Sequence, residues 1–266
     1  MKKSVFVVAA MLAASVGFSQ NLTSNKGEAY LPETGDRALG FDAVPVLNVF
    51  KFNTSDKVSA KYVDGVSIFG KRFHDANTAA RYGVSFNWGT TKSTIEVADL
   101  SNGAGENQFV ENDSRVNNFA TTLTLGHEHR RGSGRVQGYG GAEGILSLGS
   151  GSVKNEFGNT LADVYADNGT DSRILEQKGA FSFGIGARAF MGVEFFIAPK
   201  LSVGAEYGLG LMFSSVKGGE STIEEVTDNG GDVTVTKSTI DNNDWSRSFM
   251  LGNDVNKGAV RMTFHF

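Results

Sequence analysis

Large apolar side chains alternate with glycine, serine and charged residues along several long stretches of this chain. In one clear stretch, Tyr82, Val84, Phe86 and Trp88 occupy every second position. A strand with this period has one apolar face and one polar face. No segment after the first sixteen residues is apolar for long enough to form a membrane helix, and the mean hydropathy is −0.18. Alternating strands are the form in which such a chain can lie in a membrane.

Eight stretches are predicted to be strands. Their connections are alternately short (residues 74–78, 131–135 and 198–200) and long (53–62, 89–117, 150–179 and 215–244). In an up-and-down barrel this order places all short turns at one rim and all long loops at the other. The sequence therefore predicts an all-β fold, a single closed antiparallel up-and-down transmembrane β-barrel of eight strands. The strands are residues 38–52, 63–73, 80–88, 118–130, 136–148, 181–195, 201–213 and 245–266, the last interrupted at Asn253–Lys257.

The N-terminus has the pattern of a secretory signal. Lys2 and Lys3 precede an apolar run from Val5 to Val16, and small residues follow near Ser19. The run is shorter than the roughly 20 residues of a membrane-spanning helix, so removal is favoured over anchoring. We expect residues 1–19 to be a signal peptide, residues 20–37 a periplasmic lead-in, and residues 38–266 the barrel.

Composition excludes several classes of protein. The chain contains no cysteine, which excludes a disulfide framework, thiol catalysis and a lipid-modified N-terminal cysteine. Without the signal, 23 basic and 29 acidic residues remain, a net charge of −6 with neutral histidines. This balance provides no electrostatic surface for nucleic acid.

Alternation alone leaves open whether the apolar face points outward, as in a membrane barrel, or inward, as in a lipocalin. The polar face is rich in Gly, Ser and Thr, which suits a narrow interior better than a solvated surface. Aromatic residues also cluster near strand ends, as in interfacial girdles. We expect the apolar face to contact lipid. The upper girdle would contain Trp88, Phe181, Phe213 and Trp245, and the lower one Phe73, Phe195 and Phe266.

With the apolar face outward, most strand charges point into the barrel. An unpaired buried charge costs several kcal/mol, so ion pairing is expected. An eight-stranded barrel is just wide enough to be filled by its own side chains. We therefore predict a structural network that plugs the periplasmic half of the interior, and above it a shallow cup lined by small polar groups. The charged residues are Arg81, Glu128, Arg130, Glu143, Arg188, Glu194, Glu206 and Arg261; Phe190 interrupts the polar face of its strand.

The histidines do not favour an enzyme. Barrel enzymes that act at the outer rim generally need a histidine as general base there. His74, His127, His129 and His265 all map to the periplasmic rim instead. His127 and His129 share one strand face but lack an evident third metal ligand. We predict no catalytic residues, no metal site and no cofactor.

The long loops are acidic, and two of them contain an Asn-Gly dipeptide flanked by aspartates. Residues Asp167–Asp171 and Asp228–Asp232 lack the full spacing of a calcium loop. Asn-Gly is a common signal for a tight hairpin turn. We interpret both segments as turns of hairpins in the loops, with Val233–Thr239 as one arm of the second.

The chain resembles the OmpA/OmpX-like outer-membrane β-barrels over residues 38–266. The resemblance is carried by the hairpin-like segments 69–84 and 195–208 and by the last strand, Arg-Met-Thr-Phe-His-Phe (261–266). It implies a Gram-negative outer-membrane location, a periplasmic C-terminus, outer-membrane lipid as surroundings, and recognition by the barrel-assembly machinery. No peptidoglycan-binding domain follows the barrel, so tethering to the cell wall is not expected. The assembly signal would consist of Val260, Met262, Phe264 and Phe266.

Three functions remain open at this point. The first is a non-enzymatic structural or surface-interaction barrel whose long acidic loops meet an extracellular ligand of unknown identity. The second is a porin-like channel for small solutes or apolar molecules. The third is an outer-membrane enzyme.

Overall fold

The computed structural model describes residues 22–42, 66–101, 108–132, 134–253 and 259–266. Within these ranges the chain forms one antiparallel sheet and one short helix, α3 (Leu161–Asn168). No helix in the described ranges is both long and apolar enough to cross a membrane. The strands are β1 (Arg37–Asp42), β2 (Val66–Phe73), β3 (Thr78–Ala98), β4 (Phe109–Arg131), β5 (Val136–Glu156), β6 (Ser172–Ala198), β7 (Leu201–Lys217), β8 (Glu220–Asp228), β9 (Val233–Asp241), β10 (Trp245–Asn253) and β11 (Ala259–His265).

The strand pairings close into a ring. Each strand from β1 to β6 pairs with the strand that follows it in the chain, and β11 pairs with both β7 and β1. β10 pairs with the part of β7 beyond β11, so that β10 and β11 occupy one position in the ring. The predicted all-β, barrel-like architecture is thus confirmed.

The interruption predicted in the last strand is present between β10 and β11. Asn253 pairs with Leu209, whereas Ala259 pairs with Glu206. Residues 254–258 lie outside the described ranges, and only two residues of β7 separate the two pairings. The register of the last strand therefore changes at this point.

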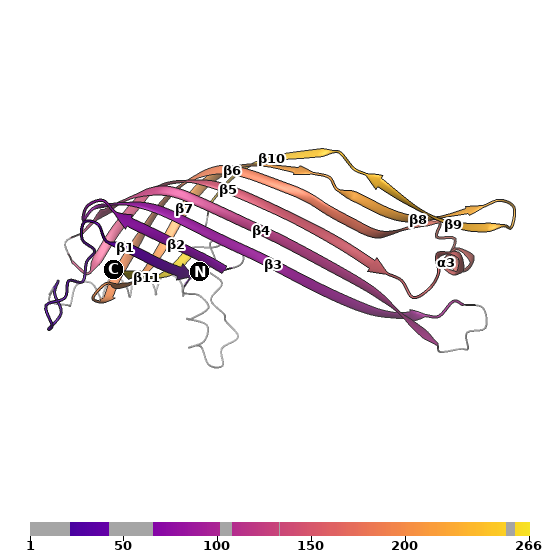
Figure 1. Ribbon diagram of the computed structural model, residues 1–266, viewed down its shortest axis with the longest axis horizontal. Helices are drawn as coiled ribbons and strands as arrows, with labels where there is room; N and C mark the ends of the chain where they lie inside the picture. The colour runs from indigo at the N-terminus through magenta and orange to yellow at the C-terminus, as the bar shows by residue number, and fades with distance from the viewer. Residues whose placement is uncertain (1–21, 43–65, 102–107, 133, 254–258) are drawn as a thin grey trace, which may run out of the picture.

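Three of the four segments predicted to be long loops, residues 89–117, 150–179 and 215–244, are largely strand, so this prediction was wrong for them; the fourth, residues 53–62, lies outside the described ranges. β3 and β4 remain paired up to Ala98 and Phe109, and β4 and β5 remain paired up to Asp113 and Glu156. Beyond the barrel, residues 172–178 of β6 leave β7 and pair with β8, which continues into β9. These strands form a curved sheet, here called the extension, that projects from one end of the barrel (Figure 1).

The extension carries few large apolar residues, and most of its side chains are exposed, apart from a region beside α3 with Arg173 and Glu224. Apolar alternation in its sequence is therefore short and interrupted. Short polar side chains bond across its strands instead. The hydroxyl of Thr94 donates to Asp113 at 2.5 Å, and that of Ser114 donates to Asn155 at 2.9 Å. Cross-strand pairs of this kind stabilise a sheet without a buried core.

The two Asn-Gly segments have different structures. Asp228–Asp232 forms the predicted turn, between β8 and β9, where the amide of Asn229 donates to the carbonyl of Asp232 at 3.2 Å. The turn predicted at Asp167–Asp171 was wrong, since this segment contains the end of α3. Gly169 caps the helix with φ of 78°, a left-handed conformation that glycine adopts without strain.

The apolar face of the barrel strands points outward, as predicted. Tyr82, Ile185 and Leu209 are 45%, 54% and 51% exposed on the outer surface. One prediction about the lower rim was wrong: Phe73 does not belong to an outer girdle, because its ring is buried inside the barrel. His265 lies at this rim, where its amide donates to the carbonyl of Lys200 at 2.7 Å, but its ring points inward and lies 5.6 Å from that of Phe73.

Residues 22–36 lie against the rim with the short turns. The carbonyl of Tyr30 accepts a hydrogen bond from the amide of Lys200 at 3.2 Å, and the Arg135 guanidinium lies 3.7 Å from the centre of the Tyr30 ring. The Lys200 ammonium also forms an ion pair with Asp36. This N-terminal segment is therefore attached to the turn between β6 and β7.

Candidate functional site

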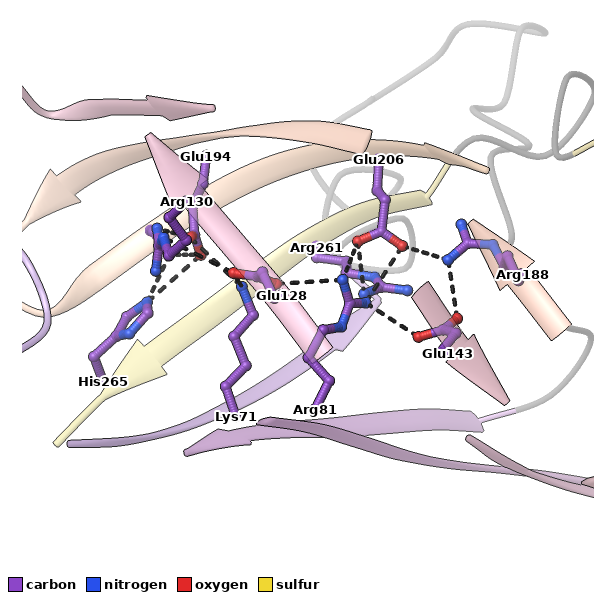
Figure 2. A network of polar contacts seen from close by, with 11 residues as sticks. Lys71, Arg81, Glu128, Arg130, Glu143, Arg188, Glu194, Glu206, Arg261 and His265 are labelled. Carbon is purple, nitrogen blue, oxygen red and sulfur yellow. Dashed lines mark hydrogen bonds and ion pairs between the residues drawn. The ribbon is translucent and has the colours of Figure 1, made fainter. Parts of the chain in front are cut away.

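The interior of the barrel is filled in its lower half by ionic side chains from seven strand positions of the ring (Figure 2). The two-residue period of the strands places these side chains inside, because large apolar residues of the same strands, such as Tyr82, Leu125 and Ile185, point outward. We call this group the plug. It consists of Lys71, Arg81, Glu128, Arg130, Glu143, Arg188, Glu194, Glu206, Arg261 and His265.

Glu206 on β7 is the centre of the upper part of the plug. Its carboxylate accepts hydrogen bonds from Arg81 at 2.9 and 3.3 Å, from Arg188 at 2.8 Å and from Arg261 at 3.1 Å. Glu143 accepts another from Arg188 at 2.9 Å. Each guanidinium presents several donors in a plane, which allows it to bridge carboxylates on different strands.

Glu194 on β6 is the centre of the lower part. It forms an ion pair with Arg130 and lies 3.6 Å from the ammonium of Lys71. The hydroxyl of Ser202 donates to it at 2.6 Å, and Nε2 of His265 lies 3.5 Å away. Four strands therefore converge on one buried carboxylate.

Glu128 on β4 connects the two parts. It accepts hydrogen bonds from Lys71 at 2.9 Å and from Arg81 at 3.3 Å. Since Arg81 also bonds to Glu206, the ionic contacts run without a break from the short-turn rim toward the middle of the barrel. Burial of so many charges is tolerated only with this degree of pairing.

Aromatic rings fill the space between the ions. Phe190, which interrupts the polar face of β6, lies 3.9 Å from the guanidinium carbon of Arg81. Lys71 lies 4.8 Å from the ring centre of Tyr139, and Arg261 lies 4.5 Å from that of Phe69. Desolvated cation–π contacts of this kind add roughly 2 kcal/mol each.

The lowest layer has the same construction. The Arg130 guanidinium lies between Phe73 and Phe196, at 5.3 and 5.6 Å from their ring centres. The His265 ring lies 5.2 Å from that of Phe196. Aromatic rings and ions together close the barrel near the short turns.

Glycine on the polar face makes room for the long side chains. A Cβ atom on Gly208 would lie 2.3 Å from Nε of Arg188, and one on Gly192 would lie 2.4 Å from the Tyr139 ring. The arginine and the tyrosine can therefore lie flat across neighbouring strands. The abundance of glycine in these strands has a steric reason.

The structure brings together the eight charged residues singled out from the sequence. It adds Lys71 and His265 to them, and it places five aromatic rings among them. Lys71 could have been found by extending the inward face of β2 from its register with β3, since it lies directly opposite Arg81. His265 follows from the alternation with Arg261 and Thr263, which are buried on the same face.

Above the plug, the interior is lined by small polar groups. A cavity with about 20 Å³ of space for water lies over Arg81 and Arg261, among Ser67, Ser85 and Thr122. This is room for one or two water molecules. Residues 43–52 and 63–65, predicted to belong to the first two strands, lie outside the described ranges, so the cup above the ionic network stays a prediction.

The described residues contain no group of three side chains suited to hold a metal ion. His127 and His129 lie on the outer face of β4, where both are exposed, and neither takes part in the plug. The chemistry that the site supports is charge pairing within a closed interior.

Comparisons with known proteins add little to this assignment. No protein-family model and no curated protein sequence matches the chain. One solved structure that is similar is the outer membrane protein OprG from Pseudomonas aeruginosa, with 10% sequence identity, 89% of this chain and 98% of that chain covered, and a TM-score of 0.27. The barrel assignment therefore stands on the strand pairings of the chain itself.

Proposed function

We propose that this chain is a Gram-negative outer-membrane β-barrel with a structural and surface-interaction role, and that its interior is permanently plugged. The observation that carries the proposal is the inversion of polarity. Outside, Leu125, Met191 and Leu251 are 71%, 66% and 67% exposed, whereas inside Glu128 and Arg130 are at most 1% exposed. A water-soluble protein rarely exposes a continuous apolar surface of this size.

The height of the apolar surface supports a membrane span. From Ala80 to Trp88, β3 rises roughly 26 Å along the strand. With a strand tilt of 35–45°, this corresponds to roughly 20 Å along the membrane normal, close to the apolar band of about 25 Å in outer-membrane barrels. Four aromatic residues mark its upper edge, because the strand pairings place them in one row across the sheet. The row runs Trp88, Phe119, Ser150, Phe181, Lys217 and Trp245.

The plug supports a structural role over conduction. Charges bound to several partners at once do not rearrange without leaving other charges unpaired. A channel for small solutes, the alternative, would require the contacts of Glu206 and Glu194 to open together.

The extension supports surface interaction. β9 forms the last position of the sheet and pairs only with β8 within the described residues. Its other edge presents backbone donors and acceptors to solvent. An exposed edge of this kind can accept an extended segment of another protein as an additional strand.

The finer assignment to the OmpA/OmpX-like barrels, with short turns and C-terminus in the periplasm, belongs to the same proposal. So does recognition of the last strand by the barrel-assembly machinery. Met262 and Phe264 lie on the outer face of β11, and Arg261 and Thr263 on the inner face. This alternation supports the proposed assembly signal at Val260, Met262, Phe264 and Phe266.

The test combines folding and conductance. We expect the protein to require detergent or lipid for folding, to migrate differently in gels before and after heating, and to remain electrically silent in planar bilayers. A monodisperse protein in buffer without detergent would contradict the membrane span. Large, stable channels would contradict the plug and favour the alternative.

A further inference from the structure

The outer face of the extension carries a row of three cations directly above the aromatic belt. Lys92 on β3 pairs with Arg115 on β4, and Arg115 pairs with Lys154 on β5. Directly paired residues project from the same face of a sheet, and neighbouring strands lie about 5 Å apart. Three positive charges are thus held side by side.

This arrangement is unfavourable for the protein alone, because like charges directly opposite each other destabilise a sheet. Two of the cations are relieved by carboxylates of the next row, Lys92 by Asp113 at 2.8 Å and Lys154 by Glu156 at 2.6 Å. Arg115, in the centre, has no carboxylate within ion-pair distance in the described parts of the chain. The two lysine side chains remain 50% and 55% exposed.

The rows below define the depth of these cations. Trp88 pairs with Phe119 and Phe119 with Ser150, one row of the outer face. Two residues further along the strands, Thr90 donates to Asn117 at 2.9 Å. The cations follow after two more residues, roughly 13 Å along the strand from Trp88 and, with a tilt of 35–45°, roughly 10 Å above it.

The order of rows matches the polarity of an outer leaflet. Apolar side chains lie at the level of acyl chains, aromatic rings at the interface, hydroxyl and amide groups above them, and cations above those. The acidic row with Asp113 and Glu156 follows after the cations, and Glu176 on β6 lies opposite Lys154 at the end of the cation row. We propose that Lys92, Arg115 and Lys154 form a binding site for the phosphate groups of a phosphorylated glycolipid in the outer leaflet, with Arg115 as the central bidentate donor.

The chemistry fits this ligand. A guanidinium binds two phosphate oxygens in one plane, and flanking ammonium groups add charge without geometric demand. A phosphate between the strands would remove the like-charge repulsion that the row creates. The inference rests on the proposed function, since it requires the apolar band to lie in a membrane.

The test uses neutral phosphatidylcholine nanodiscs and three probes: a diphosphorylated lipid A, its dephosphorylated form, and inorganic pyrophosphate. The test variant is K92Q/R115Q/K154Q. The control, K26Q/R131Q/K237Q, removes the same charge at exposed positions outside the row. Native mass spectrometry measures the bound probes, and insertion into the nanodisc is verified first by heat-modified gel mobility.

We expect the wild type and the control to bind the diphosphorylated lipid at least about tenfold more tightly than the dephosphorylated form. The test variant should bind the two lipids with affinities within about twofold of each other, because it lacks all three cations that would contact the phosphates. The single variant R115Q, with one charge removed, should lose most of the preference as well and serves if the triple variant does not fold. Relative to the wild type, R115Q should have a higher thermal midpoint without phosphorylated lipid, because the like-charge repulsion is reduced. With this lipid its midpoint should be lower than that of the wild type, because the phosphate contact is lost.

Equal binding of both lipids by the wild type, or an unchanged preference in the variants, would overturn the site. Pyrophosphate binding as tight as that of the lipid would overturn the assignment to a headgroup. A wild type that does not insert into nanodiscs would instead contradict the proposed function, and with it the basis of this inference.

Discussion

The plug and the extension belong to the same strands, yet they keep charged residues in opposite ways. In the plug, Glu206 is buried and accepts hydrogen bonds from three arginines. In the extension, Glu156 pairs with Lys154 at 2.6 Å while its side chain is 64% exposed. The ion pairs of Glu206 are thus shielded from water, whereas the pair of Glu156 with Lys154 is largely solvated.

This difference indicates that the plug contributes more to the stability of the protein than the extension does. A buried carboxylate without its partners costs several kcal/mol, whereas an exposed pair contributes little because water solvates each charge alone. The plug holds the barrel in one arrangement, and the extension is free to vary its polar residues for contacts with the surroundings. The predictions below test this contrast.

The largest effect is expected for Glu206→Gln. The substitution removes the charge that compensates Arg81, Arg188 and Arg261, and we expect it to lower the free energy of unfolding by about 3–5 kcal/mol. Urea-dependent unfolding in lipid vesicles, followed by heat-modified gel mobility, measures it.

The matched control in the extension is Glu156→Gln, which breaks its pair with Lys154. No measurable change is expected there, because both side chains are mostly solvated. If both variants lose similar stability, the contrast between plug and extension is wrong.

The second effect concerns the aromatic rings of the plug. Phe190→Leu keeps an apolar side chain but removes the ring that faces Arg81 at 3.9 Å. We expect a loss of about 1–2 kcal/mol in the same unfolding assay. The control Phe249→Leu alters an outward ring that is 69% exposed and should change stability less. A larger loss for Phe249 would show that lipid contacts, rather than cation–π contacts, dominate.

The predictability of the two regions from sequence differs for the same physical reason. The eight charged residues that the sequence predicts for the plug follow from the two-residue period, because each occupies an inward-facing position in the alternation of its strand. The partners of Phe190 do not follow, since β3 and β6 are not neighbours and only barrel closure brings Arg81 to the ring. From the sequence alone, Phe190 therefore only interrupts the alternation of its strand, and its contact with Arg81 becomes evident only in the folded barrel.

The extension could not be predicted in this way. Apolar residues alternate there only over short stretches, as at Ile95 and Val97, and the pattern of a polar strand equals that of a polar loop. The cation row likewise requires the register that pairs Lys92 with Arg115 and Arg115 with Lys154. Spacing along the chain alone does not contain that register.

A smaller effect is expected at the N-terminal segment that attaches to the plugged rim. Burial tends to raise the pKa of the Asp36 carboxyl, but hydrogen bonds from Lys200 and the amide of Glu33 outweigh it and hold the pKa below its ordinary value of 3.8. A carboxyl with a lowered pKa stabilises the folded state above its ordinary value, and this stabilisation is lost as the pH falls through the lowered value.

We therefore expect Asp36→Asn to increase hydrogen exchange of residues 22–36 by about two- to fivefold at pH 6, corresponding to less than about 1 kcal/mol. As the pH falls through the lowered pKa of Asp36, wild type and variant should converge, after correction for intrinsic exchange rates. The control Asp99→Asn changes a carboxyl beside the extension and should leave this segment unaffected. A difference that persists at low pH would assign the attachment to contacts other than the Asp36–Lys200 pair.

The smallest effect on the barrel is expected from removing the hairpin of β8 and β9. Lys217 and Trp245 are directly paired, so residues 218–244 can be replaced by Asn-Gly, the two-residue turn that suits adjacent antiparallel strands. The deletion removes the pairing of β8 with residues 172–178 but no contact of the plug. We expect barrel stability within about 1 kcal/mol of the wild type, since the lost contacts lie in the extension and most of them, the Arg173–Glu224 pair excepted, are solvent-exposed. Loss of folding would show instead that the extension and the plug form one cooperative unit, because the barrel strands would then depend on polar pairings far above the membrane. Retained folding, with strand addition at β9 abolished, would separate the region that stabilises the protein from the region that meets its partners.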